Sequence, residues 1–215
     1  MEHAVFDGWS ESCFLAAAGD CGLSAEQARA LCPRGAADLA AAYHLRGDRD
    51  MAAAFENADL SGLRYSQKVA ELVWLRVGAA DRELVRRGMA HFALPQYAAE
   101  GAGLIWATAD AVWTALGDTS GDVNWYSKRA ILSGVLGSVF LFWLGDTSEG
   151  DSATRDFIDR RIADVMRFER FKGQLRDSPA LRPFMEIADR MGASIKPPRR
   201  GPFPDYPGWL KRETE

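Results

Sequence analysis

The chain has 215 residues, 47% of them hydrophobic and 26% charged, which suits one compact globular unit and excludes an intrinsically disordered protein. Its 26 basic and 30 acidic residues give a net charge of -4, which argues against a protein that mainly coats nucleic acid, because binding phosphates requires a basic surplus. The odd set Cys13, Cys21 and Cys32 fits no disulfide framework or zinc spacing, so we interpret these cysteines as small core residues in a reducing compartment.

The N-terminal residues show neither a signal peptide nor an organelle-import leader, so export and import are not expected from this form of the sequence. Apolar residues recur at three- and four-residue spacing along the chain, which predicts an all-α protein. Ser10 and Ser24 are good N-caps for short helices at residues 10–18 and 25–31. A longer helix follows at residues 36–55, and this order of helices is typical of a helix-turn-helix.

The electrostatics of this N-terminal part do not suit DNA. Residues 1–60 contain four arginines, no lysine and ten acidic residues, a local charge of -6. The short helix in the recognition position offers Gln27 and Arg29 but no basic cluster. We therefore predict a degenerate helix-turn-helix that does not bind nucleic acid.

Longer helices are expected in the rest of the chain, at residues 65–77, 81–93, 97–116, 122–144 and 152–175. The sequence Leu-Gly-Asp-Thr-Ser occurs twice between them. Gly117 and Gly145 are predicted to take the left-handed conformation there, and the polar residues that follow are predicted to cap the next helix. Gly101 and Gly103 lie inside a helix, where we expect them to allow close helix packing.

The longest apolar run, residues 131–144, is shorter than the roughly 20 residues that cross a bilayer, so we predict a buried helix and no membrane span. Residues 181–195 form an amphipathic pattern and residues 197–209 a proline-rich tail. The expected domains are therefore a helix-turn-helix-like part at residues 1–60, a larger helical part at 61–177 and a C-terminal segment at 178–215.

The helix expected at residues 97–116 is apolar on nearly every face. One stripe joins Ile105, Ala109, Val112 and Leu116, and a second joins Ala102, Trp106 and Trp113. For each single residue, packing in a buried central helix is the simpler interpretation. The more specific interpretation is that the helix forms the wall of an elongated apolar pocket. Asp110 lies among these residues and needs a partner such as Arg129 or Lys128; a structural ion pair is favoured over a catalytic acid.

Trp125 and Tyr126 are adjacent in the first turn of the next helix, where their side chains point about 100° apart. From the residues alone, an exposed partner or membrane surface and packing into the core are equally good interpretations. The three histidines, His3, His44 and His91, form no metal-binding pair, and nucleophile and nucleotide-binding motifs are absent. The sequence therefore favours a protein that is not an enzyme and has no metal or cofactor.

Several blocks of the sequence resemble the ubiquinone-biosynthesis accessory lipid-binding family, which has a TetR-regulator-like fold. The most specific is Asn-Trp-Tyr-Ser-Lys-Arg-Ala at residues 124–130, preceded by Gly-Asp-Thr-Ser. The blocks Phe-Asp-Gly-Trp-Ser, Pro-Arg-Gly-Ala-Ala-Asp-Leu and Thr-Ala-Asp-Ala-Val-Trp extend the resemblance, which covers roughly residues 5–175.

The resemblance implies a homodimer that binds an isoprenoid quinone or a phospholipid and presents quinone precursors to the demethoxyubiquinone hydroxylase. The lipid-binding residues that we expect are Leu72, Leu75, Ile105, Trp106, Ala109, Val112, Trp113 and Leu116. The expected hydroxylase-binding residues are Asp122, Trp125, Tyr126 and Arg129. The expected dimer contacts are Val135, Val139, Phe142, Ile158 and Val165.

The resemblance also implies a cytoplasmic protein peripheral to the inner membrane. Relatives carry a helix before the Phe-Asp-Gly-Trp block, so here that helix is expected to be short or missing, or the chain to start further upstream. Residues 181–195 either touch the membrane or pack on the protein itself, because their polar face is neutral. The alternative function is a TetR-type transcription regulator with a hydrophobic effector.

Overall fold

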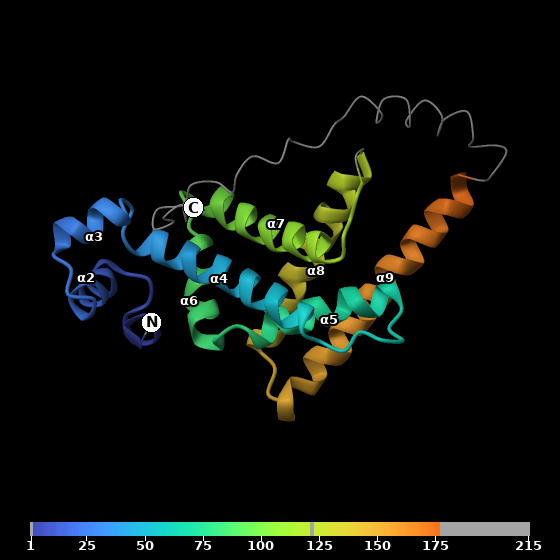
Figure 1. Cartoon of the computed structure of the whole chain (residues 1–215), viewed down its shortest axis with the longest axis horizontal. Coiled ribbons are helices and arrows are strands. Elements are labelled where there is room, and N and C mark those ends of the chain that lie inside the picture. The colour runs from blue at the N-terminus through green and yellow to red at the C-terminus, as the bar shows by residue number, and fades with distance from the viewer. Residues whose placement is uncertain (1, 121–122, 177–215) are drawn as a thin grey trace, which may run out of the picture. The chain divides into compact units, whose positions relative to one another are not determined.

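The computed structural model describes residues 2–120 and 123–176, and this part of the chain consists of helices joined by turns and loops, without a β-strand (Figure 1). The predicted all-α class is therefore confirmed. The residues of the expected C-terminal segment at 178–215 lie outside the described residues, as does Asp122.

The N-terminal helices follow the caps that the sequence predicts. They are α1 (Glu2–Asp7), α2 (Glu11–Asp20), α3 (Ala25–Leu31) and α4 (Ala36–Glu56). Ser10 Oγ accepts a hydrogen bond from the backbone N–H of Cys13, and Ser24 forms a reciprocal capping box with Gln27. The helix α1 occupies the position where a short or missing helix was expected, and it is six residues long.

The remaining helices also lie within about two residues of their predicted bounds. They are α5 (Tyr65–Gly78), α6 (Arg82–Phe92), α7 (Ala98–Ala115), α8 (Val123–Leu144) and α9 (Ser152–Arg176), with a 3-10 turn η1 at Glu149–Asp151. Asp81 caps α6 by accepting from the backbone N–H of Leu84 at 2.9 Å. Periodicity and capping residues therefore define these helices well.

The repeated Leu-Gly-Asp-Thr-Ser motif behaves differently at its two positions. Gly117 has φ of 71° and ends α7 as predicted. The prediction is wrong for Gly145, which stays outside the left-handed region, while Gly150 takes it with φ of 60°. Asp146 nevertheless caps α9 as expected, because its carboxylate accepts from the backbone N–H of Thr154 at 2.8 Å.

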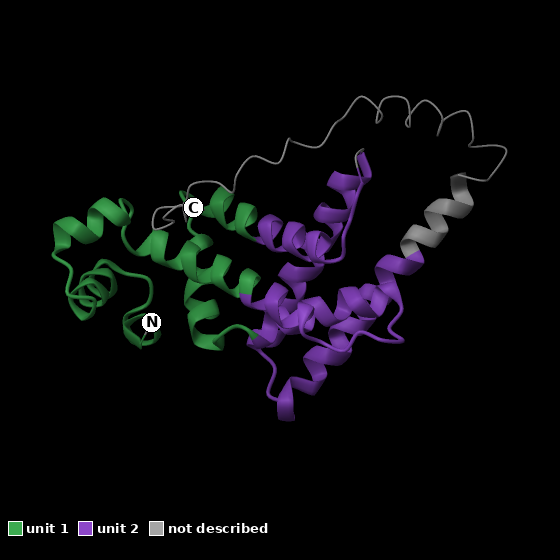
Figure 2. Cartoon of the chain, in the orientation of Figure 1, with its two compact units in different colours: residues 1–49, 79–104, 200–215 green, residues 50–78, 105–199 purple. Residues whose placement is uncertain are grey.

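The described chain divides into two compact units (Figure 2). Unit 1 holds residues 2–49 and 79–104, and unit 2 holds residues 50–78 and 105–176. The division differs from the expected boundary at residue 60, because α6 returns to pack on α1.

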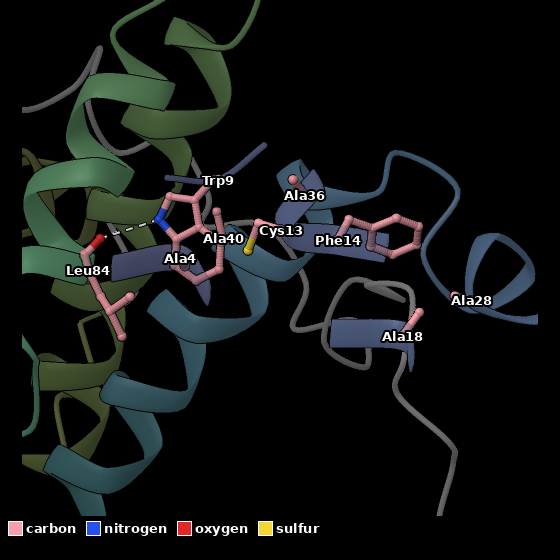
Figure 3. Close-up of a cluster of buried hydrophobic side chains, with 9 residues drawn as sticks. All are labelled: Ala4, Trp9, Cys13, Phe14, Ala18, Ala28, Ala36, Ala40 and Leu84. Carbon is pink, nitrogen blue, oxygen red and sulfur yellow. Dashed lines mark hydrogen bonds between the residues drawn. The ribbon is translucent and has the colours of Figure 1, made fainter. Parts of the chain in front are cut away.

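The core of unit 1 is built around Trp9 and Phe14 (Figure 3). The indole N–H of Trp9 donates to the backbone carbonyl of Leu84 at 3.3 Å, which ties α6 to the N-terminal helices. Cys13 is buried in this cluster, as expected of a small core residue. That interpretation fails for Cys21, which is exposed.

Unit 2 is centred on α8, which packs against α5 and α9. Leu132, Leu136 and Val139 are almost fully buried on one side of it. By length and composition, α8 is also the one helix of the described chain that could cross a membrane, with 22 residues. The uninterrupted apolar run at residues 131–144 is only the second part of this helix. A helix in a protein core can have the same length and apolar composition, so these two properties alone do not make α8 a membrane span.

Candidate functional site

The site begins where α7 ends and α8 starts, within unit 2. Gly117 turns the chain, and the next residue, Asp118, donates its backbone N–H to the carbonyl of Trp113 at 2.9 Å. A positive φ has little steric cost for glycine, so the turn can be tight. As a result, the Asp118 carboxylate lies beside the last turns of α7 and within reach of α8.

Four charged side chains meet at this turn. Arg129 is fully buried, and its Nε donates to Asp110 Oδ1 at 2.6 Å while its Nη1 lies 3.3 Å from Asp118 Oδ2. Lys128 Nζ donates to Asp118 Oδ1 at 2.7 Å and to Ser120 Oγ at 2.8 Å. The predicted pairing of Asp110 with Arg129 is confirmed, whereas Lys128 takes a different carboxylate. We call Asp110, Asp118, Lys128 and Arg129 the ion network.

Asp118 is the centre of the ion network. Its side chain is 4% exposed. Burial by itself would raise the pKa of the Asp118 carboxyl, but hydrogen bonds from Lys128, Ser120 and Arg129 outweigh that effect and keep the pKa below its usual value. The sequence indicated Asp118 only as a capping residue, because nothing in the local pattern shows that two cations from the next helix return to it.

Three aromatic side chains lie next to the ion network. The ring centroids of Trp125 and Tyr126 are 4.8 Å apart in an edge-to-face arrangement, and Trp106 of α7 lies 6.0 Å from Trp125 and 6.4 Å from Tyr126. All three side chains are half-buried. We call them the aromatic cluster. Trp125 and Tyr126 therefore combine packing on their neighbours with some exposed surface, and a partner or membrane surface there stays a prediction.

The predicted hydroxylase-binding residues differ in their solvent exposure. Trp125 and Tyr126 keep accessible surface, while Arg129 has none. Asp122 lies outside the described residues. Arg129 instead contacts Trp125, with its guanidinium carbon 4.0 Å from the centroid of the indole ring.

The predicted lipid-binding residues all belong to unit 2. Leu72, Ala109, Val112 and Trp113 are buried, and Leu75, Ile105, Trp106 and Leu116 are half-buried. The ring of Tyr65 stacks on Trp113 at 6.3 Å, a contact that the helical pattern of α7 could not indicate. Such burial suits core packing and the wall of a lipid site equally, so lipid binding stays a prediction.

The predicted dimer contacts divide in the same way. Val135, Val139 and Ile158 are buried in the packing of α8 with α9, and Val165 is half-buried. Phe142 is exposed and stacks on Phe157 with ring centroids 4.4 Å apart. Its neighbour Leu141 is 65% exposed. Of the predicted dimer contacts, Phe142 is thus the exposed one, and Leu141, which was not predicted, extends its exposed apolar surface.

The histidines lie in separate places in unit 1. His3 pairs with Asp20, His44 Nε2 lies 3.2 Å from the carbonyl of Leu104, and His91 stacks on Tyr97. Within the described residues, no three side chains of His, Cys, Asp or Glu are grouped to hold a metal ion.

Comparison with known proteins identifies the segment that carries the site. The COQ9 family model matches residues 98–169. The chain is 31% identical over 121 residues to the probable ubiquinone biosynthesis protein coq9, mitochondrial, of Dictyostelium discoideum, covering 55% of this chain and 39% of that protein. It is 32% identical over 92 residues to the ubiquinone biosynthesis protein COQ9, mitochondrial, of Rattus norvegicus, covering 43% of this chain and 30% of that protein. The matched regions thus span less than half of either relative.

A longer match extends to the ubiquinone biosynthesis protein coq9, mitochondrial, of Schizosaccharomyces pombe, which is 26% identical over 75% of this chain and 65% of that protein. Among solved structures, the fold is similar to that of a TetR transcriptional regulator from Nitrosomonas europaea, with a TM-score of 0.56 and 21% identity over 70% of this chain and 83% of that chain. The predicted TetR-like fold and the family resemblance are therefore confirmed, and residues 98–169, which include the site, match the COQ9 family model.

Proposed function

We propose that the protein is a lipid-binding accessory factor of ubiquinone biosynthesis that presents isoprenoid quinone precursors to the demethoxyubiquinone hydroxylase and is not itself an enzyme. The observation that carries this proposal is the aromatic cluster, held against the buried Arg129 of the ion network within the residues that match the COQ9 family model. Partly exposed aromatic rings on a rigid support are typical of binding hot spots. The ubiquinone biosynthesis proteins to which the chain is similar support the pathway.

In this proposal, apolar side chains of α5 and α7 replace the bilayer around a polyprenyl tail, so that the tail need not cross water. The hydroxylase docks on the aromatic cluster. The proposal includes a homodimer through α8 and α9 and a peripheral position at the inner membrane, on the cytoplasmic side. A bound isoprenoid quinone or phospholipid is expected in place of a cofactor.

Lipid extraction of the purified chain, followed by mass spectrometry, tests the lipid-binding part. We expect a co-purifying isoprenoid quinone or phospholipid, and saturable binding of added short-chain ubiquinone to chain that has been stripped of lipid. A chain that is reproducibly free of lipid and does not bind the added quinone would contradict the proposal.

A TetR-type transcription regulator is the second candidate, because the fold is similar to that of the Nitrosomonas regulator. The charge of -6 over residues 1–60 opposes it, since contacts with DNA phosphates need lysine and arginine. A gel-shift assay at low salt on the DNA upstream of its own coding sequence separates the two candidates. Tight, sequence-specific binding would favour the regulator, and no shift favours the accessory factor.

A further inference from the structure

Arg129 is the only predicted hydroxylase-binding residue among those described that has no exposed surface. We infer that Arg129 is a positioning residue, which holds the Trp125 indole in the orientation that a docking partner meets and does not touch the partner itself. This inference rests on the proposed function, because it assigns a role to a residue behind the proposed docking surface.

The contacts between Arg129 and Trp125 involve both the ring and the backbone. The guanidinium carbon of Arg129 lies 4.0 Å from the indole centroid, within the range of a cation-π interaction. Nη1 of the same side chain donates to the backbone carbonyl of Trp125 at 3.1 Å. One residue therefore restrains the ring of Trp125 and the helical turn that carries it.

Two carboxylates also hold the guanidinium group. Asp110 belongs to α7 and Asp118 to the turn after it, at 2.6 Å and 3.3 Å respectively. The helix α7 also contributes Trp106, whose ring packs on Trp125. Trp125 is therefore connected to α7 twice, directly through Trp106 and indirectly through Arg129 and Asp110. A side chain held before binding loses less conformational entropy when the partner docks.

Lys128 provides a matched control, since it is the adjacent cation on the same helix. It also binds Asp118, at 2.7 Å, but its Nζ lies near the ring of Trp113, at 5.4 Å from the centroid. Removing Lys128 therefore disturbs the ion network without removing a contact to Trp125.

The experiment uses the full chain labelled with 5-fluorotryptophan, in which fluorine NMR resolves the seven tryptophans. The substitution W125F assigns the Trp125 resonance. We expect Arg129→Met to shift or broaden that resonance and to weaken binding of the demethoxyubiquinone hydroxylase about tenfold, the size of a partly desolvated cation-π contact. Lys128→Met should move the Trp113 resonance and leave the Trp125 resonance unchanged.

A second variant covers the case in which Arg129→Met does not fold. Asp110 has a side chain that is 40% exposed, so Asp110→Ala should fold. The substitution removes the carboxylate that accepts from Nε of Arg129. It should broaden the Trp125 resonance and weaken hydroxylase binding several-fold. An unchanged Trp125 resonance in a folded Arg129 or Asp110 variant would overturn the inference, as would native hydroxylase affinity in both. A native chain that does not bind the hydroxylase at all would overturn the proposed function, and the fluorine spectra would still decide whether Arg129 holds Trp125.

Discussion

Lys128 Nζ lies 2.7 Å from Asp118 Oδ1, and the second oxygen of the same carboxylate lies 3.3 Å from Arg129 Nη1. One buried acid thus serves two cations from consecutive residues of α8. Removing its charge would leave Arg129 fully buried with a single carboxylate, Asp110. The turn between α7 and α8 therefore depends on Asp118.

We expect Asp118→Asn to lower the free energy of unfolding by about 3 kcal/mol, as is usual when one partner of a buried ion pair is removed. Urea denaturation followed by circular dichroism measures the change. Asp164→Asn is the control, because Asp164 pairs with Arg161 and Arg167 near the surface and its loss should change stability by less than about 1 kcal/mol. Equal effects of the two substitutions would contradict a central role of Asp118.

The pH dependence of stability follows from the lowered pKa of Asp118. A carboxyl group whose pKa is lower in the folded than in the unfolded chain adds stability above its unfolded pKa, about 3.9, and loses that contribution as the pH falls through the folded value. Between pH 7 and pH 3, native protein should therefore lose more stability than the Asp118→Asn variant. Parallel curves would show that Asp118 does not contribute.

Gly101 and Gly103 form a matched pair on α7. A Cβ at Gly101 would lie 2.8 Å from Cβ of Phe92, whereas a Cβ at Gly103 would meet nothing within 4 Å. Close packing is thus confirmed for Gly101 and was wrongly predicted for Gly103. We expect Gly101→Ala to destabilise the chain by about 1–3 kcal/mol and Gly103→Ala to stabilise it by about 0.5–1 kcal/mol. Thermal unfolding of both variants measures their stabilities. Stability changes of the same sign in the two variants would contradict the prediction.

Trp125→Lys tests the docking surface directly. It should weaken hydroxylase binding at least about tenfold and change the free energy of unfolding by about 1 kcal/mol, as for a partly exposed site. Trp74→Lys is the control, because Trp74 is also half-buried in unit 2 and has its own cation, with Arg155 5.4 Å from its ring centroid. A large loss of stability in Trp125→Lys alone would show that Trp125 is a core residue.

Leu141→Glu tests the proposed dimer. Leu141 is 65% exposed beside Phe142, so a charge there should raise the dimer dissociation constant at least about tenfold while the fold stays intact. Light scattering coupled to size-exclusion chromatography gives the mass. Leu94→Glu, at an exposed leucine of unit 1, should leave the mass unchanged. A native chain that is monomeric at all concentrations would contradict the dimer.

Local signals in the sequence were sufficient for most of the fold. Ser10, Ser24 and Asp81 each cap the helix that they precede, since capping depends on a side chain and the three residues after it. The pairing of Asp110 with Arg129 was also predictable, because a carboxylate on an apolar helix needs a cation.

Features that depend on tertiary packing could not be predicted in this way. Arg129 lies beside Lys128 in the second turn of α8, and only the position of α7 shows that it is buried there. The same holds for Cys21, which is exposed although its residue type favours the core. The return of α6 to α1, which gives unit 1 its extent, is a contact between distant residues that periodicity does not encode.

The most direct test of the proposed function is the rate at which the demethoxyubiquinone hydroxylase converts a long-chain demethoxyubiquinone embedded in liposomes, measured with and without this protein. We predict that the native chain increases the rate several-fold and that Trp125→Lys does not. An identical rate with folded native chain, with Trp125→Lys and with no added chain would contradict the account.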